Sequence, residues 1–199
     1  MTADPIAHAW QQFARETTDH QLTVLHDGGL YRHLRMAVPG TRMWSWDVVT
    51  WPGHLATSGD IANGFTFRRL DDMFEFFGPA RFHQGVPVIN PDYWAEKLAT
   101  TQREAAQSYS DQAFLESVGH SLANAVEYGR VTEDESAELM VEARYESGEK
   151  HSALEWWSTN GPRIDSDWWE ADFKDYDHHF LLTCFAIVTT ISAYRKAKS

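Results

Sequence analysis

Short runs of apolar residues alternate with polar residues through the first third of the chain, and turn residues separate these runs. Residues 43–50 are rich in β-branched and aromatic side chains, which favour a strand. The following segment, Trp51-Pro52-Gly53-His54, has the residue order of a type II turn, because proline presets φ and glycine accepts a positive φ. The pattern predicts an antiparallel meander of four or five strands within residues 20–69. The other strands are expected at 22–25, 30–38, 55–58 and 65–68.

Apolar residues at intervals of three or four predict helices in the rest of the chain. One helix should precede the sheet, and its apolar side includes Ile6, Trp10 and Phe13. After Asn90 the helical pattern dominates. Two helices are expected at 70–77 and 92–107, and a third should be capped by Ser110. A capping box of Thr132 and Glu135 should open a fourth, which ends near Gly148. A fifth is expected at 151–157, and Gly161-Pro162 should end it.

The last predicted helix begins at Asp177 and is apolar almost all round between Phe180 and Ile191. A bilayer span needs roughly 20 apolar residues, so this stretch is too short, and it also contains threonines. We therefore expect a central helix of the core, with Phe180, Leu181, Cys184, Ile187, Val188 and Ile191 mostly buried. The chain should form one α+β domain over residues 1–199, in which the antiparallel meander of residues 20–69 packs against a mainly helical layer of residues 70–199.

The charge of the chain is strongly acidic and unevenly distributed. The formal net charge is −12; residues 101–199 carry 9 Lys and Arg against 18 Asp and Glu, whereas residues 1–100 carry 8 against 11. This charge argues against binding to duplex nucleic acid or to an anionic membrane. Residues 26–69 are locally basic, with five arginines against three aspartates. That excess is compatible with an anionic small ligand, although arginines are also common on exposed strand faces.

Six residues of the meander form the candidate ligand-binding site. If Gly28-Gly29 is a two-residue loop and the turn at 38–41 is symmetric, alternation places the six on one sheet face. Aromatic side chains with a cationic rim can stack on a base and pair with a phosphate. Alternatively, the tryptophans belong to the core and the histidines to its edge, and a slip of one residue would separate the group. The candidate residues are His26, Tyr31, His33, Arg35, Trp44 and Trp46.

Other chemistry has little support in the sequence. The single cysteine, Cys184, excludes an internal disulfide, and its apolar helix should bury the thiol, raise its pKa and make it inert. The adjacent pair His178-His179 diverges by about 100° on a helix, which disfavours chelation of one metal ion. No phosphate-binding loop and no nucleophile elbow occur. We expect no catalytic residue, no metal and no cofactor.

Several stretches together resemble a family of small uncharacterised proteins of bacteriophages and prophages. They are HDGGLYRHLRM, WDVVTWPGHLATSGD, FRRLDDMFEFF and INPDYWAEKL, dense over residues 20–100, and more weakly DHHFLLTCFAIV over 177–188. The resemblance implies a phage protein made in the bacterial cytoplasm, with an accessory role such as counter-defence. The lone cysteine and the absence of a signal-peptide pattern fit that location.

Three functional hypotheses follow. The first is a non-catalytic accessory protein that binds an anionic small ligand, such as a nucleotide signal, on the sheet face. The alternative is an inhibitor that binds a host protein through the acidic helical half of the chain. An enzyme acting on a nucleotide is the weaker third hypothesis.

Overall fold

The computed structural model describes residues 5–62, 64–78 and 81–199, with the backbone alone for 100–102. The chain divides into two compact units. We call residues 1–106 with 176–199 the sheet unit, and residues 107–175 the helical unit. The predicted α+β class is confirmed, since an antiparallel sheet comes first and most helices follow it.

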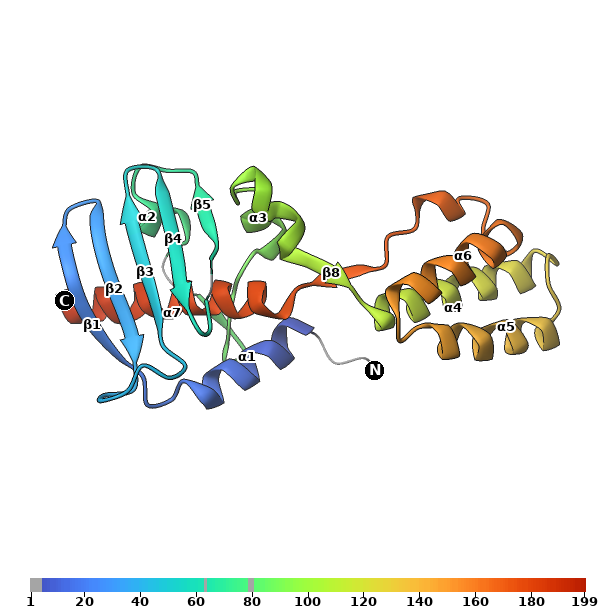
Figure 1. Cartoon of the computed structure of the whole chain (residues 1–199), viewed down its shortest axis with the longest axis horizontal. Coiled ribbons are helices and arrows are strands. Elements are labelled where there is room, and N and C mark those ends of the chain that lie inside the picture. The colour runs from blue at the N-terminus through green and yellow to red at the C-terminus, as the bar shows by residue number, and fades with distance from the viewer. Residues whose placement is uncertain (1–4, 63, 79–80) are drawn as a thin grey trace. The chain divides into compact units, whose positions relative to one another are not determined.

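Five antiparallel strands form the main sheet, in the order β1-β2-β3-β4-β5, as the meander pattern predicted. Neighbours in sequence are neighbours in the sheet (Figure 1). The hairpin between β3 and β4 is the predicted turn, in which Trp51 pairs with His54 and Gly53 has a φ of 78°. The strands are β1 (Gln21–Gly28), β2 (Tyr31–Ala37), β3 (Trp46–Trp51), β4 (His54–Gly59) and β5 (Thr66–Arg68).

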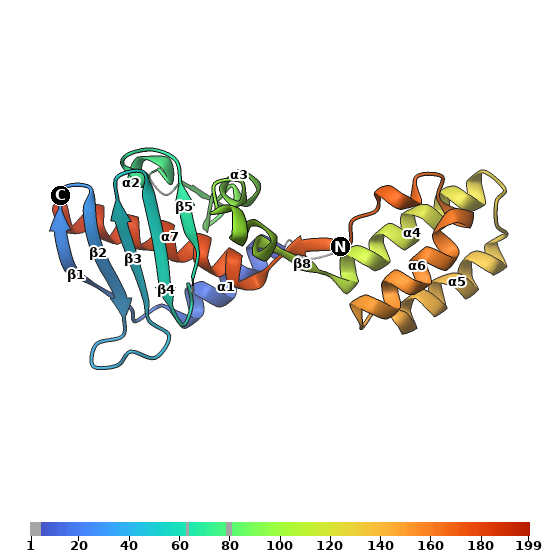
Figure 2. The ribbon, with the colours of Figure 1, turned by 45° about the horizontal axis from the view of Figure 1, so that its top comes forward.

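Helices α1 (Pro5–Glu16) and α7 (His178–Lys198) lie on the same face of this sheet, as Figures 1 and 2 show. Side chains alternate along each strand, so Leu34, Met36 and Val48 are buried beneath these helices. We call the opposite face of the sheet the outer face. The shorter elements of the sheet unit are α2 (Met73–Phe76), β6 (Phe82–His83), β7 (Val86–Pro87), α3 (Pro91–Ala95) and the 3₁₀ helix η1 (Thr100–Ala106).

Helix α7 is the central buried helix that the sequence predicts. Asp177 caps it by accepting from the backbone N–H groups of His179 and Phe180. All six predicted core residues on it are buried. The helix is also long and apolar enough to cross a membrane, with 61% of its most apolar window buried in the protein. Core helices share these properties, so they are weak evidence for a span.

The helix expected at 92–107 is wrong, because the chain breaks between α3 and η1. Residues 97–99 instead extend the main sheet. The N–H of Arg68 donates to the carbonyl of Lys97 at 2.8 Å, and the N–H of Ala99 donates to the carbonyl of Thr66 at 2.9 Å. These bonds pair backbone N–H and C=O groups on the open edge of β5, and this pairing is favoured over continuing the helix through residues 97–99.

The helical unit has its own core, whereas the sequence analysis expects a single core. Its buried residues, among them Phe114, Leu139 and Trp156, form a cluster separate from that of the sheet unit. The predicted caps are confirmed, with Ser110 capping α4 and the box of Thr132 and Glu135 opening α5. The elements here are α4 (Asp111–Glu127), α5 (Glu133–Glu146), α6 (Lys150–Ile164), η2 (Trp168–Glu170) and the ribbon of β8 (Gln107–Tyr109) with β9 (Lys174–Tyr176).

Gly161 and Pro162 do not end the preceding helix, contrary to the prediction, and both lie inside α6. Gly161 is buried in a position where a Cβ atom would lie 3.2 Å from both Trp157 and Trp168. The Trp157 indole and the Cβ atom of Trp168 therefore pack closely on the glycine, which leaves no room for a larger side chain. Pro162 has no N–H to donate to the carbonyl four residues earlier, so α6 continues through its last turn with one backbone hydrogen bond fewer.

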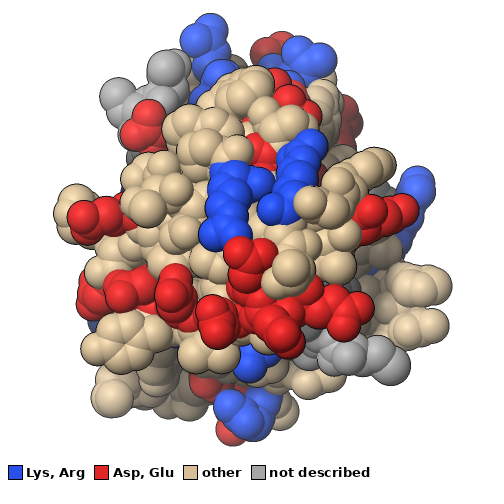
Figure 3. All heavy atoms as spheres, turned by 90° about the vertical axis from the view of Figure 1, so that its right-hand side faces the viewer, with Lys and Arg blue, Asp and Glu red and all other residues tan. Residues whose placement is uncertain are grey.

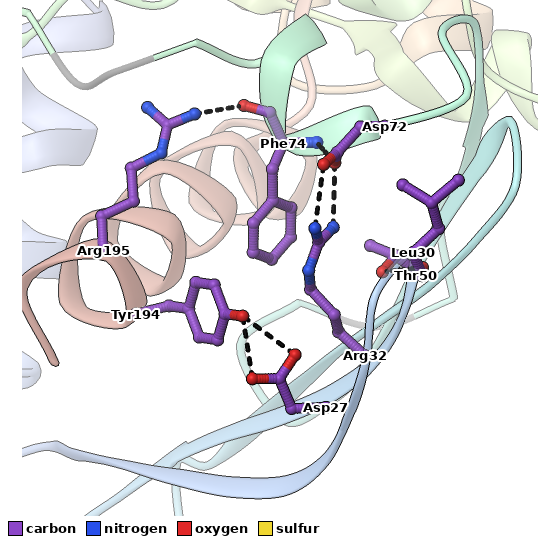
Figure 4. A network of polar contacts seen from close by, with 8 residues as sticks. All are labelled: Asp27, Leu30, Arg32, Thr50, Asp72, Phe74, Tyr194 and Arg195. Atoms are coloured by element: carbon purple, nitrogen blue, oxygen red, sulfur yellow. Dashed lines mark hydrogen bonds and ion pairs between the residues drawn. The ribbon is translucent and has the colours of Figure 1, made fainter. Parts of the chain in front are cut away.

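A partly buried ion pair joins α2 to the inner face of the sheet (Figure 4). Arg32 donates two hydrogen bonds to Asp72, at 2.9 and 2.8 Å, and its guanidinium lies 4.6 Å from the centre of the Phe74 ring. Asp72 also caps α2 by accepting from the N–H of Phe74. The hydrogen bonds from Arg32 hold the pKa of Asp72 below its usual value. The Asp72 carboxylate therefore accepts from both Arg32 of β2 and the backbone of α2, and so links the two elements.

The C-terminal end of α7 joins the same network. Tyr194 donates to the carboxylate of Asp27 on β1 at 2.9 Å, and Arg195 donates to the carbonyl of Phe74 at 2.9 Å (Figure 4). Lys198 forms an ion pair with Asp27. Basic side chains in the last turn also complement the helix dipole, as the sequence predicts. The network fixes the end of α7 against the sheet.

Candidate functional site

Four of the six predicted ligand-binding residues share the outer face of the sheet, and the two tryptophans lie elsewhere. His33 and Arg35 lie on the outer face, since they alternate with the buried Leu34 and Met36. His26 pairs with His33 and therefore shares that face. The other three are Tyr31, which is exposed at the start of β2 and alternates onto the outer face, Trp46 on the inner face, and Trp44 in the loop before β3.

The predicted strand registers are wrong, and this explains the separation. A symmetric turn at residues 38–41 would place Arg35 opposite Trp44, but Arg35 pairs with Asp47, a shift of three positions. An odd shift exchanges the two faces of the sheet, so Trp46, which was expected on the same face as Arg35, turns inward. In the first hairpin Gly28 pairs with Tyr31, and an irregularity between Val24 and His26 shifts the register again. The loop is therefore Gly29 and Leu30, one residue later than expected.

Arg35 is neutralised by a carboxylate on the neighbouring strand. Its Nε and Nη2 donate to the two oxygens of Asp47, each at 2.7 Å, and Nε2 of His33 lies 2.8 Å from the same carboxylate. Burial alone would raise the pKa of Asp47, but the hydrogen bonds from Arg35 and His33 lower it overall. Asp47 is thus ionised and balances Arg35, which makes Arg35 a poor partner for an anionic ligand.

The two predicted tryptophans have structural roles. Trp46 is 1% exposed, and its indole N–H donates to Oγ1 of Thr190 on α7 at 2.8 Å. Trp44 has a φ of 56° and is half exposed, and its carbonyl accepts from Nε2 of His20 at 2.8 Å. The His20 ring stacks on Trp46, with centroids 5.1 Å apart. The sequence analysis left open the alternative that the tryptophans lie in the core with histidines at its edge. Trp46, packed beneath His20, fits that alternative.

A different set of aromatic and basic residues crosses the outer face near β5. Trp51 pairs with His54, and His54 pairs with Arg68. The bridge between Phe67 and Leu98 places Lys97 beside Arg68 on the added strand. Residues directly opposite one another project from the same face of a sheet. The resulting set is the outer row: Trp51, His54, Arg68 and Lys97.

A pocket of about 440 Å³ lies over the basic end of the outer row. Lys97 pairs with Glu96 at 2.9 Å, and its Nζ lies 4.2 Å from the centre of the Tyr93 ring. Arg68 and Arg103 are exposed, and neither forms an ion pair with the described part of the chain. The pocket therefore presents two unpaired guanidinium groups. Its lining residues are His54, Thr66, Arg68, Glu96, Lys97, Leu98, Ala99 and Arg103.

The aromatic end of the row is held in place by stacking. The rings of Trp51 and His54 are 4.9 Å apart and inclined by 10°. Nδ1 of His54 donates to the carbonyl of Pro52 at 3.0 Å, which fixes the ring and leaves Nε2 as its remaining polar atom. The turn predicted at Trp51 to His54 thus places the His54 ring, backed by Trp51, in the lining of the pocket that Arg68 and Arg103 share.

A second pocket of about 440 Å³ borders Arg35 and the loop that follows β2. Its basic lining residues are Arg35 and Arg42. Because Asp47 balances Arg35, only Arg42 adds uncompensated positive charge there. The pocket beside the outer row carries more free positive charge and has the His54 ring in its lining, so it is the better candidate for an anionic ligand.

Part of the outer row was visible in the sequence. The turn at Trp51 to His54 and the basic pair Arg68-Arg69 were recognisable, but nothing linked them. The missing connection is the strand at 97–99, which pairs across the sheet edge and carries no strand signal of its own. Arg103 lies further along the same segment, so its place in the pocket could not be anticipated.

Within the described residues, no three His, Cys, Asp or Glu side chains are grouped as a metal site. Cys184 is fully buried, and burial raises its thiol pKa well above the usual value, as the sequence predicts.

Comparisons of the chain with protein-family models, with curated proteins and with solved structures find no match. The case for the outer row therefore depends on its own geometry.

Proposed function

We propose that the protein binds an anionic small molecule with an aromatic ring, such as a nucleotide, in the pocket beside the outer row. It does so as a non-catalytic phage accessory protein that counters host defence. The observation that supports this most is the pair of unpaired guanidinium groups, Arg68 and Arg103, in one pocket of a strongly acidic protein.

The electrostatics of the two units favour this location. The helical unit carries 16 Asp and Glu against 5 Lys and Arg, which is −11 of the total −12, so the sheet unit is close to neutral. An anion is repelled by most of the surface and attracted where arginines lie without acidic partners. A guanidinium group can also bind a phosphate through two parallel hydrogen bonds, which favours phosphate ligands.

The order of residues along the outer row suits a nucleotide. Adjacent strands are about 4.8 Å apart, so Trp51 and Arg68, two strands apart, are separated by roughly 10 Å. A base lying on the surface of His54 and Trp51 would direct its phosphates toward Arg68 and Arg103. Stacking of a base on an aromatic side chain contributes roughly 1–3 kcal/mol. The volume of about 440 Å³ is within the usual range of small-ligand pockets.

The phage accessory part of the proposal is supported by sequence resemblance. The resembling stretches over residues 20–100 include Trp51, His54, Arg68 and Lys97, so they cover the outer row. Sequestering a nucleotide signal requires affinity and no catalytic group.

Isothermal titration with AMP, ADP, cyclic AMP and inorganic phosphate tests the proposal. Arg68→Gln should weaken nucleotide binding about tenfold or more, since a hydrogen bond to a charged group contributes about 1.5–3 kcal/mol. Arg69→Gln is the matched control, because Arg69 is also exposed but does not line the pocket. The absence of binding by every nucleotide, or equal weakening by both substitutions, would contradict the proposal.

A second candidate function is binding to a basic host protein through the helical unit. The view of Figure 3 shows Asp and Glu side chains gathered in a band across this face, with some basic side chains bordering it above and below. The charge of −11 on this unit is the observation that favours it.

A further inference from the structure

Helix α5 has an exposed apolar stripe on the side that faces away from its own core. Leu139 and Ala143 are buried on one side of the helix. Ala137, Val141 and Tyr145 follow one another at intervals of four on another side, with Val141 67% and Tyr145 86% exposed. Residues four apart on a helix are neighbours on its surface. The three side chains therefore form a continuous apolar strip.

An acidic stripe runs beside the apolar one. It consists of Asp134, Glu138, Glu142 and Glu146, again at intervals of four. In the described helical unit none of these carboxylates has an ion-pair partner, and Glu142 makes only a long hydrogen bond of 3.4 Å with the Trp156 indole. Like charges at this spacing destabilise a helix. A basic partner would relieve that repulsion.

We propose that this face of α5 docks a basic amphipathic helix of a partner protein. The apolar residues of the partner would cover Val141 and Tyr145, and its Lys or Arg side chains would pair with Glu138 and Glu142. The charge of the helical unit favours a basic partner. A second copy of the chain would bring another helical unit with a charge of −11 and would be repelled. Anionic lipids and nucleic acids would be repelled for the same reason. The inference rests on the second candidate function and specifies its surface.

The test uses the full-length protein and a fluorescently labelled 18-residue peptide that forms an amphipathic helix with Leu on one face and Lys on the other. Binding is followed by the fluorescence anisotropy of the labelled peptide. The double substitution Val141→Ser with Tyr145→Ser should weaken binding about tenfold, which corresponds to about 1.4 kcal/mol. Tyr128→Ser is the control, because Tyr128 is 72% exposed and lies outside α5. Substituting Glu138→Gln with Glu142→Gln should weaken binding and reduce its dependence on salt.

The outcomes separate the docking surface from the broader proposal. If the peptide binds but the double substitution at 141 and 145 has no effect, the docking surface is overturned while charge-driven partner binding survives. If the peptide does not bind at all, both are overturned. Sedimentation that shows a dimer of the wild-type protein, dissociated by Val141→Ser, would replace the partner helix with a second copy and overturn the proposal.

Discussion

The ion pair of Arg32 and Asp72 offers the sharpest test of how the sheet unit is stabilised. Replacing Asp72 with asparagine removes the charge but keeps a side chain that caps helices as well as aspartate does. The substitution leaves the Arg32 side chain, which is 11% exposed, without its carboxylate, and its Nε has no hydrogen-bond partner among the residues that the structure describes. A lost hydrogen bond to a charged group costs about 1.5–3 kcal/mol, so we expect destabilisation of that size.

Asp72→Ala should cost about 1 kcal/mol more than Asp72→Asn, because it also removes the cap on the N–H of Phe74. The pH dependence has a definite sign. The pKa of Asp72 is lowered in the folded protein, so its contribution is present above the unfolded value near 3.8 and is lost as pH falls through the folded value. The stability difference between wild type and Asp72→Asn should therefore shrink below about pH 4.

Hydrogen-exchange mass spectrometry of peptides from β2 and β3 is the appropriate assay. Tryptophans occur in both units, so total fluorescence would mix two transitions. Exchange within β2 and β3 reports the free energy of opening of the sheet unit itself. Unchanged exchange in Asp72→Asn would show that the ion pair makes no net contribution. Equal effects of Asn and Ala would show that the cap contributes nothing.

Two further substitutions test the fold. Ile187→Asp should prevent folding, since Ile187 is 0% exposed and an unpaired buried charge is costly; a soluble variant with a native circular dichroism spectrum would contradict this. Gly59→Ala should destabilise the protein by about 1–3 kcal/mol or more, because Gly59 has a φ of 121° and a Cβ atom there would lie 2.4 Å from the carbonyl of Ser45. An unchanged midpoint of thermal unfolding would be inconsistent with that close approach.

Sequence reasoning succeeded where the structural signal is local. The turn at Trp51 to His54 needs only its own residues to form, and the Ser110 cap and the box at Thr132 are equally self-contained. The burial of α7 could be predicted because nine of the twelve residues from Phe180 to Ile191 are apolar and lie all round the helix. The α+β class followed from these elements.

The register between β2 and β3 could not be read from the turn, because residues 38–45 form a long irregular connection and not a tight hairpin. The alternation within β2 does contain the answer for that strand. Leu34 and Met36 are apolar whereas His33 and Arg35 are polar, so the first pair should face the core. The assumption of a symmetric turn put Trp46 with the polar pair, and that choice misplaced the site.

The candidate site itself was hidden by non-local pairing. The apolar spacing of residues 92–107 favours a helix, yet the unpaired edge of β5 takes up residues 97–99. That pairing aligns Lys97 with Arg68 and brings Arg103 to the same pocket. Neither effect leaves a pattern within a short window of sequence.

Mapping of backbone amide shifts during a nucleotide titration tests the central claim most directly. In ¹⁵N-labelled protein titrated with ADP, we predict that the largest shifts occur at His54, Thr66, Arg68, residues 97–99 and Arg103, and that the shifts vanish in Arg68→Gln. Shifts confined to Arg35 and Arg42 would move the site to the other pocket. No shift at any amide of the sheet unit at millimolar ADP would contradict a nucleotide-binding outer row.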